Sequence, residues 1–165
     1  MNTLELFKEV RVFVFDVDGV MTDGQLLITE EGHLLRSMNI KDGYAIQWAV
    51  KQGYHVWAIS GARSEGVRTR LQKLGIEEVH IDIKDKVPVL KSLLQKHGIS
   101  KEHLLYMGDD FPDLECMQFA GFPTCPADAV PEIIALSRYI SPFGGGKGCV
   151  RDVIRKTMLL HDKWT

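Results

Sequence analysis

Acidic side chains follow two apolar stretches of the sequence, at the points where a buried strand would end. The stretches are Val12–Phe15 and Leu104–Met107, and the acids that follow them are Asp16, Asp18, Asp109 and Asp110. Clustered carboxylates repel each other unless a cation lies between them, and ligation by oxygen alone suits a hard ion such as Mg²⁺. A bound Mg²⁺ attracts phosphate, and a carboxylate can then act as the nucleophile. A single DxDG is as consistent with a turn, but two clusters at matching strand ends predict phosphoryl chemistry.

Two further polar positions strengthen this prediction. Ser60 and Gly61 follow the apolar stretch His55–Ile59 and offer a hydroxyl group and backbone N–H groups to phosphate oxygens, although serine is also a common helix N-cap. Lys86 opens the helical segment before the second acidic cluster, where its ammonium group can neutralise phosphate and acids. Alone, Lys86 would be interpreted as a surface lysine. The order DxDG, Ser, Lys, GDD makes the pattern specific.

The elements that must position these residues alternate between strand-like and helix-like segments. The expected strands are Val12–Phe15, His55–Ile59, Val79–Ile81, Leu104–Met107 and Phe122–Cys125. The expected helices are Asp42–Gly53, Ser64–Leu74, Lys86–His97, Asp113–Phe119, Pro131–Ser137 and Cys149–His161. This alternation is typical of a Rossmann-like α/β fold, a parallel sheet with helices on both faces. Ligands of such sheets bind beyond the carboxyl ends of the strands, which is where the acids, the serine and the lysine are expected.

One segment breaks the alternation. Gln25–Thr29 and His33–Met38 are joined by Glu30–Gly32 and predict a small β-hairpin flap after the first strand. No insertion of domain size separates the acidic clusters, Ser60 and Lys86, and no repeat or linker divides the chain. We therefore expect residues 1–165 to form a single domain without a cap domain.

Composition excludes several classes of protein. The chain of 165 residues has 20 Lys+Arg against 22 Asp+Glu, a net charge of −2, which excludes a strongly basic nucleic-acid binder. No apolar run approaches the roughly 18–20 residues of a membrane span, and no cleavable hydrophobic segment begins the chain. Cys116, Cys125 and Cys149 are widely spaced and odd in number, as in a reduced protein. We expect a cytoplasmic protein with no nucleic-acid or membrane partner.

The ordered motifs resemble the haloacid dehalogenase superfamily of phosphatases. The strings DVDGVMTDG at 16–24, NIKDG at 39–43 and GGGKGCVR at 144–151 are similar to the 3-deoxy-D-manno-octulosonate 8-phosphate (KDO 8-phosphate) phosphatase group, and the similarity runs from about Val10 to about Leu160. The resemblance implies a capless haloacid dehalogenase-type fold. It also implies Mg²⁺-dependent hydrolysis of KDO 8-phosphate to KDO and phosphate through an aspartyl-phosphate, in lipopolysaccharide precursor biosynthesis.

The resemblance also implies roles for individual residues. Asp16 would be the nucleophile and a metal ligand. Asp18 would be general acid and then base, with its backbone carbonyl on the metal, and Asp109 would be the third metal ligand. Ser60 and Lys86 would hold the phosphate, and phosphoryl transfer chiefly needs such positioning and charge neutralisation.

Further residues are expected around the substrate or behind the site. Those implied for substrate binding, besides Asp18 and Lys86, are Asn39, Lys41, Asp42, Gly43, Gly61 and Arg70. Asp42 is equally an N-cap of its helix and Arg70 equally an exposed side chain. The supporting residues are Asp110, Asp113 and Lys147. Asp113 either supports the acidic loop or merely begins the next helix. Lys147 lies in the segment Gly144–Gly148, which we expect to be a mobile loop over the site.

Departures from the family pattern leave alternatives open. KDO-specific members usually carry arginine at the place of Ala62, with Arg63 following here, and Gln47 replaces a residue that is often basic. The same chemistry on a nine-carbon 3-deoxy-nonulosonate 9-phosphate is therefore the alternative. A non-catalytic binding or oligomerising module is a more distant one, because such relatives commonly lack one of the acids present here. Since a capless site would stand open, the resemblance implies a homotetramer in which hairpins and tails cover neighbouring sites.

Overall fold

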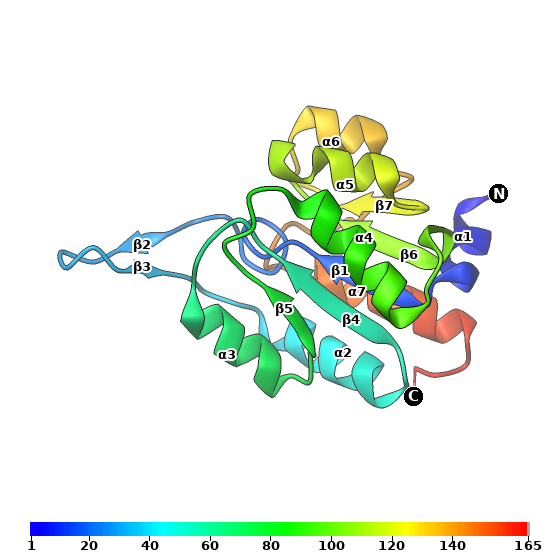
Figure 1. The fold of residues 1–165 in the computed structure, drawn as a ribbon. Helices are drawn as coiled ribbons and strands as arrows, with labels where there is room; N and C mark the ends of the chain where they lie inside the picture. Colours follow the sequence, from blue (N-terminus) through cyan, green and yellow to red (C-terminus); the bar gives the residue numbers. More distant parts are fainter. Residues whose placement is uncertain (165) are drawn as a thin grey trace.

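A parallel sheet of six strands forms the centre of the molecule (Figure 1). The computed structural model describes residues 1–164. The strands, in their order across the sheet, are β5 (Glu78–His80), β4 (His55–Ile59), β1 (Val12–Phe15), β6 (Leu104–Met107), β7 (Phe122–Cys125) and β8 (Tyr139–Ile140). Every neighbouring pair is parallel. The predicted α/β class and its parallel sheet are confirmed.

The register of the central strands brings three loops together. Phe15 at the end of β1 pairs with Ala58 of β4 and with Met107 of β6. Three strands therefore end at nearly the same height, and the residues that follow each of them begin side by side at one edge of the sheet. This is the edge at which the sequence placed its acids, its serine and its lysine.

Helices cover both faces of the sheet (Figure 1). One face carries α1 (Thr3–Glu9), α2 (Ile40–Lys51), α3 (Glu65–Lys73) and α7 (Cys149–Leu160). The other carries α4 (Lys86–His97), α5 (Leu114–Phe119) and α6 (Pro131–Leu136). Phe13 and Phe15 pack into the first core and Val12 and Val14 into the second. Because side chains alternate along a strand, a strand covered on both faces must be apolar throughout, as VFVF is.

Two elements were missed in the sequence. The helix α1 has only seven residues, begins at Asn2 with a capping box to Glu5, and buries Leu6 and Phe7 against the sheet. The edge strand β8 has only two residues, too few for a periodic signal. The helix α2 begins two residues earlier than expected, because the side chain of Asn39 accepts hydrogen bonds from the backbone of its first turn.

The expected hairpin is present and extends away from the sheet (Figure 1). Its strands, β2 (Leu27–Ile28) and β3 (Leu34–Leu35), are antiparallel and shorter than predicted. Their apolar side chains are exposed; Leu27 is 68% exposed and Ile28 66%. Within residues 1–164 no further domain covers the sheet edge, as predicted for a capless fold. No helix in the described part of the chain is long and apolar enough to cross a membrane.

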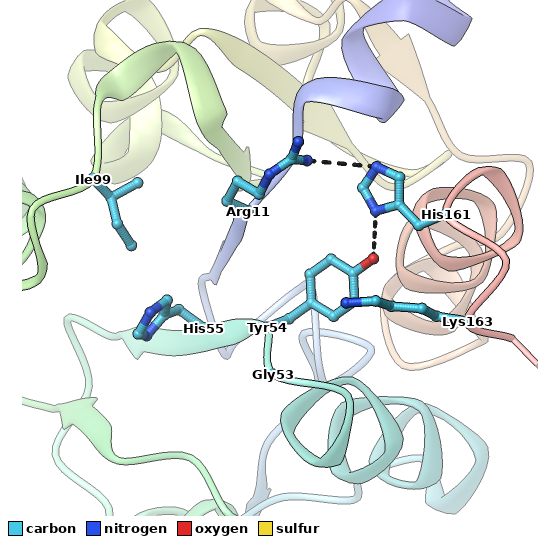
Figure 2. Close-up of a pocket in the computed structure, with 7 residues that line it drawn as sticks. All are labelled: Arg11, Gly53, Tyr54, His55, Ile99, His161 and Lys163. Carbon is cyan, nitrogen blue, oxygen red and sulfur yellow. Dashed lines mark hydrogen bonds between the residues drawn. The ribbon is translucent and has the colours of Figure 1, made fainter.

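A hollow of about 470 Å³ lies at the opposite edge, beside the amino ends of β1 and β4 (Figure 2). Its basic side chains bind carbonyl groups at the ends of helices. Arg11 Nη1 donates to the carbonyl oxygens of Lys8 and Val10, both at 2.9 Å, and Lys163 Nζ donates to that of Gln52 at 3.2 Å. His161 Nε2 lies 2.8 Å from the carbonyl oxygen of Lys8. This cluster closes α1 and α2 and attaches residues 161–163 to them.

Candidate active site

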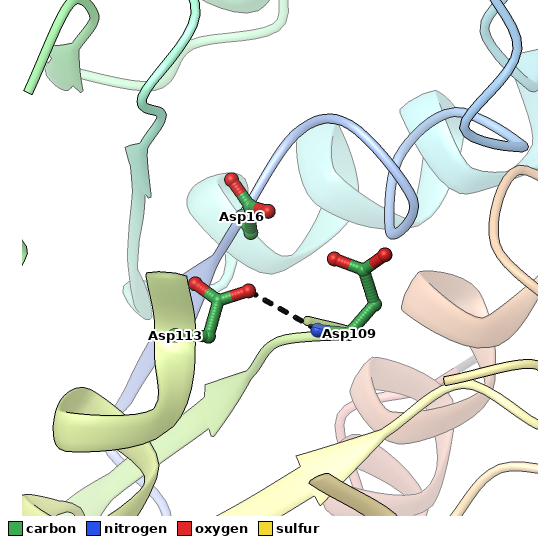
Figure 3. Close-up of side chains that lie close together, drawn as sticks. All are labelled: Asp16, Asp109 and Asp113. Atoms are coloured by element: carbon green, nitrogen blue, oxygen red, sulfur yellow. Dashed lines mark hydrogen bonds between the residues drawn. The ribbon is translucent and has the colours of Figure 1, made fainter. Parts of the chain in front are cut away.

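The acids that follow β1 and β6 meet at the carboxyl edge of the sheet. Asp16 comes directly after β1, Asp109 lies in the loop after β6, and Asp113 ends the short 3₁₀ turn η2 (Phe111–Asp113) (Figure 3). Each contributes a carboxylate oxygen to a group within 4.8 Å of one another. Asp16 is only 7% exposed and Asp113 is fully buried. The sheet register therefore gathers three acids that lie far apart in the sequence.

Lys86 is the cation that stabilises this group. It is the first residue of α4, is buried, and places Nζ 2.9 Å from Asp16 Oδ1 and 2.8 Å from Asp113 Oδ1. Burial alone would lower the pKa of Lys86, but the charges of the two carboxylates raise it to about 12. The lysine is therefore charged at neutral pH and is shared between two acids.

The side chain of Asp113 binds the loop that follows β6. The sequence left open whether Asp113 supports this loop or merely begins the next helix. Its Oδ1 accepts hydrogen bonds from Lys86 and, at 2.7 Å, from the hydroxyl of Tyr106, and its Oδ2 accepts one from the backbone N–H of Asp109 at 3.1 Å. Its side chain makes no capping bond to α5. Asp113 thus connects the lysine to the loop that carries Asp109.

Electrostatics at this edge fit a cation. Burial, followed by the charge of Asp113, raises the pKa of Asp16 well above its usual range. Burial and the charges of Asp113 and Asp110 raise the pKa of Asp109 to about 7. A divalent ion would favour the charged form of both carboxylates. The oxygens of Asp113 already accept three hydrogen bonds, so Asp16 and Asp109 are the side chains that fit as ligands.

Gly19 explains the glycine of the DxDG motif. Its φ of +87° favours glycine, and a Cβ atom at this position would lie 1.8 Å from Asp109 Oδ2. Asp109 therefore occupies the space that any side chain at position 19 would need. The DxDG loop, residues 16–24, and the loop after β6 approach each other as closely as they do because residue 19 lacks a side chain.

An open pocket of about 460 Å³ surrounds the acids. It is lined by seven residues that the sequence singled out, Asp16, Asp18, Ser60, Gly61, Lys86, Asp109 and Asp110. Gly19, Gly24, Ala62 and Pro112 complete the lining. Ser60 is buried with its hydroxyl oxygen accepting from the N–H of Ala62, and Asp110 is exposed at the rim. The structure therefore brings these acids, the serine and the lysine together in one pocket, while their roles stay a prediction.

Sequence reasoning missed Arg36, which lies just after β3. Its Nε and Nη2 donate to the two oxygens of Asp18 at 2.7 and 3.1 Å, and only 6% of its side chain is exposed. A bidentate pair of this kind fixes the orientation of a carboxylate. The base of the hairpin thus positions Asp18. No local pattern marks the pair, because the partners are 18 residues apart and meet only when the hairpin folds.

Several predicted substrate-side residues, and the predicted supporting residue Lys147, do not line this pocket. Those outside it are Asn39, Lys41, Asp42, Gly43, Arg70 and Lys147. Asn39 caps α2, whereas the buried Asp42 accepts a hydrogen bond from the N–H of Arg151 at 2.9 Å and so binds the first turn of α7. The N-cap expected at Asp42 is therefore at Asn39. Arg70 lies against Gly43, and both Lys41 and Lys147 are exposed.

The glycine loop, Gly144–Gly148, packs against the DxDG loop, contrary to the mobile cover we expected. The N–H of Gly146 donates to the carbonyl of Val20 at 2.9 Å, and Asn39 Nδ2 donates to the carbonyl of Gly146 at 3.2 Å. A Cβ atom on Gly145 would lie 2.0 Å from the carbonyl oxygen of Gly19. The glycines allow the backbone of this loop to approach that of the DxDG loop. In a sequence, a run of glycines needed for such close packing has the same pattern as a flexible loop.

Comparison with known proteins identifies this arrangement. Residues 73–148 match the haloacid dehalogenase-like hydrolase family, and the class defined by the fold and site is that of the phosphoric monoester hydrolases. The chain is 33% identical over 156 residues to the 3-deoxy-D-manno-octulosonate 8-phosphate phosphatase KdsC of Escherichia coli, covering 94% of this chain and 83% of that protein. The enzyme of the same name from Yersinia pestis is 32% identical over 162 residues, 98% of this chain and 87% of that protein.

Solved structures agree with the sequence comparison. The crystal structure of the Yersinia pestis phosphatase superposes with a TM-score of 0.94 at 31% identity, covering 97% of this chain and 86% of that one. The phosphatase of Moraxella catarrhalis, in complex with a magnesium ion, a phosphate ion and KDO, gives 0.91 at 32% identity, with 95% and 90% covered. The chain belongs to the 3-deoxy-D-manno-octulosonate 8-phosphate phosphatase family of haloacid dehalogenase-like hydrolases.

Proposed function

We propose that this protein hydrolyses KDO 8-phosphate to KDO and phosphate, with Mg²⁺ as its cofactor. The observation that carries the proposal is the pocket in which Asp16, Asp109 and the shared Lys86 converge. The similarity to a phosphatase crystallised with magnesium, phosphate and KDO supports the same substrate and ion. The complete set of acids opposes a purely structural module.

The residues divide the reaction between them. Asp16 attacks phosphorus while the sugar oxygen leaves, giving an aspartyl-phosphate, and Asp18 supplies the proton to that oxygen. Asp18 then accepts a proton from the water molecule that attacks the aspartyl-phosphate, which releases phosphate and restores Asp16.

Binding of the phosphate falls to the neighbouring groups. Lys86 and Ser60 line the pocket and neutralise or hydrogen-bond the phosphate oxygens. Asp16 and Asp109 would hold Mg²⁺ together with the carbonyl of Asp18, and Asp110, which is exposed at the rim, would act through water. When bound, the ion neutralises charge on the transferring phosphoryl group.

Steady-state kinetics with three substrates test the assignment. The value of kcat/KM for KDO 8-phosphate should exceed that for p-nitrophenyl phosphate by at least about 100-fold, an advantage of roughly 3 kcal/mol in transition-state binding. Turnover no faster than that of p-nitrophenyl phosphate would refute the substrate. A larger value for a nine-carbon 3-deoxy-nonulosonate 9-phosphate would assign the enzyme to that substrate instead. Asp16→Asn should abolish hydrolysis of all three, because it removes the nucleophile.

We also propose a homotetramer in which the hairpin contacts other copies of the chain. Four apolar side chains of β2 and β3 are exposed on a hairpin too small to form its own core: Leu27, Ile28, Leu34 and Leu35. Apolar surface of this kind is typical of an interface. Light scattering should give the mass of four chains, and Leu27→Asp with Ile28→Asp should lower it. A fully active monomer would contradict the proposal.

For its location we propose the cytoplasm. Cys116, Cys125 and Cys149 are free and buried, which supports a reducing compartment. Fractionation of cells that produce the protein, followed by detection with an antibody, tests this location.

A further inference from the structure

Tyr106 lies behind the site, on β6, and does not line the pocket. It is fully buried, and its hydroxyl donates to Asp113 Oδ1 at 2.7 Å. The same oxygen accepts a hydrogen bond from Lys86 Nζ at 2.8 Å. Tyr106 therefore contacts the acid that contacts the lysine, and it is the deepest member of this chain of hydrogen bonds.

The position of Lys86 depends on Asp113. An ammonium group has three N–H donors; Lys86 Nζ lies 2.9 Å from Asp16 and 2.8 Å from Asp113, which leaves one donor for a ligand in the pocket that it lines. The third donor meets a phosphate oxygen only when the first two partners are fixed. Asp113 is also the acceptor for the backbone N–H of Asp109, so its movement would shift the metal-ligating loop as well.

We propose that Tyr106 is a positioning residue for phosphoryl transfer. Its hydroxyl supplies the third donor to Asp113 and fixes that carboxylate, which in turn fixes Lys86 and the backbone of Asp109. This inference rests on the proposed roles of Asp16 and Lys86 but not on the identity of the sugar. Without the hydroxyl, Asp113 keeps its hydrogen bonds from Lys86 and from the N–H of Asp109, but the orientation of its carboxylate is no longer fixed by the hydrogen bond from β6.

The chain offers a matched control. The hydroxyl of Tyr139, on the edge strand β8, donates to Asp152 Oδ2, also at 2.7 Å, and Asp152 is buried like Asp113. Neither Tyr139 nor Asp152 lines the pocket. The substitutions Tyr106→Phe and Tyr139→Phe therefore each remove one hydroxyl-to-carboxylate hydrogen bond without removing a ring. A purely structural role for Tyr106 predicts the same phenotype for both variants.

The experiment compares both variants with the wild type, using p-nitrophenyl phosphate and saturating Mg²⁺. We expect Tyr106→Phe to lower kcat about tenfold with KM within about threefold, because the interaction lost is one that aligns the transition state. Inhibition by orthovanadate, which imitates that transition state, should weaken about tenfold, and inhibition by inorganic phosphate less than about threefold. Tyr139→Phe should keep wild-type kcat and vanadate inhibition, and thermal unfolding should show both variants folded.

The outcomes separate this inference from the proposed function. A kcat for Tyr106→Phe within twofold of the wild type, or an equal loss in Tyr139→Phe, overturns the positioning role alone. A fall in kcat without weaker vanadate inhibition overturns it too. A wild-type protein that hydrolyses neither KDO 8-phosphate nor p-nitrophenyl phosphate in the presence of Mg²⁺ overturns the proposed function together with this inference, whereas failure on KDO 8-phosphate alone leaves the role of Tyr106 standing.

Discussion

A substitution at Gly145 tests whether the glycine loop, Gly144–Gly148, is packed in place or is a mobile cover over the site. The glycine loop contacts the DxDG loop through this residue, and its N–H also donates to Asp128 Oδ1 at 2.9 Å. A Cβ atom there would lie 2.0 Å from the carbonyl oxygen of Gly19 and 2.7 Å from that of Thr22. Both obstacles are backbone atoms of the DxDG loop, which cannot turn aside as a side chain would. Gly145→Ala must therefore move one of the two loops.

The size of the effect follows from these distances. Ordinary van der Waals contact begins near 3.4 Å, so the loops must separate by more than 1 Å. Displacements of about 1 Å at a catalytic group cost on the order of 100-fold in rate. Overpacking of a well-packed site costs about 1–3 kcal/mol, which lowers the Tm of a domain of this size by about 3–10 °C. We expect Gly145→Ala to show both losses.

Thermal unfolding by circular dichroism and p-nitrophenyl phosphate kinetics measure the two effects. Gly66→Ala is the control, because Gly66 is exposed within α3 and a Cβ atom there meets nothing within 4 Å. That substitution should stabilise the protein by about 0.5–1 kcal/mol and leave kcat unchanged. If Gly145→Ala kept the wild-type Tm and kcat/KM, the packing argument would be refuted and the mobile-loop interpretation restored.

Three further measurements test other parts of the structure. Hydrogen bonds from Lys96, His80 and His97 overcome the effect of burial and lower the pKa of Glu78 to about 2, so the stability that Glu78 contributes is present above its usual pKa of 4.5 and is lost as pH falls toward 2. Because the Lys96 side chain is 63% exposed, the effect is small, and we expect Glu78→Gln to remove about 1–2 kcal/mol of the acid-dependent free energy of unfolding. Equal profiles of unfolding free energy against pH for the variant and the wild type would contradict this. Arg36→Gln should lower kcat for KDO 8-phosphate about tenfold but for p-nitrophenyl phosphate less than about threefold, since p-nitrophenol leaves without a proton; an equal loss on both substrates would mean that Arg36 does not act through Asp18. Dialysis against EDTA should abolish activity, and added Mg²⁺ should restore it. Asp109→Asn should raise the Mg²⁺ concentration that gives half-maximal activity at least about 100-fold, whereas Asp110→Asn, at an exposed residue, should raise it less than about fivefold.

A feature could be predicted from the sequence when the residues that determine it are close together along the chain. The strand β1 was predictable because burial on both faces requires an uninterrupted apolar run, and the acids after it followed from the rule for parallel sheets. The N-cap role expected of Asp42 was wrong: Asn39 caps the helix, and the partner of Asp42, the N–H of Arg151, is 109 residues away. Tyr106 was not noticed because in an apolar run an aromatic ring is expected to pack, and its hydroxyl acquires meaning only when Asp113 is placed beside it.

The site carries several negative charges, which explains why its loops are held by contacts between one another as well as by the acidic side chains. Five carboxylates lie at this edge, those of Asp16, Asp18, Asp109, Asp110 and Asp113, and within residues 1–164 the basic side chains that form ion pairs with them are Lys86 and Arg36. Such an arrangement repels a phosphate dianion and itself, and the charge of Asp113 adds to the effect of burial in raising the pKa values of Asp16 and Asp109. Protons and a divalent cation therefore compete for the same oxygens. A loop held only by its side chains would relax by moving the acids apart. Gly145 lets the glycine loop lie against the backbone of the DxDG loop, and Gly19 leaves room for the side chain of Asp109, so the three loops lie close together around the acids.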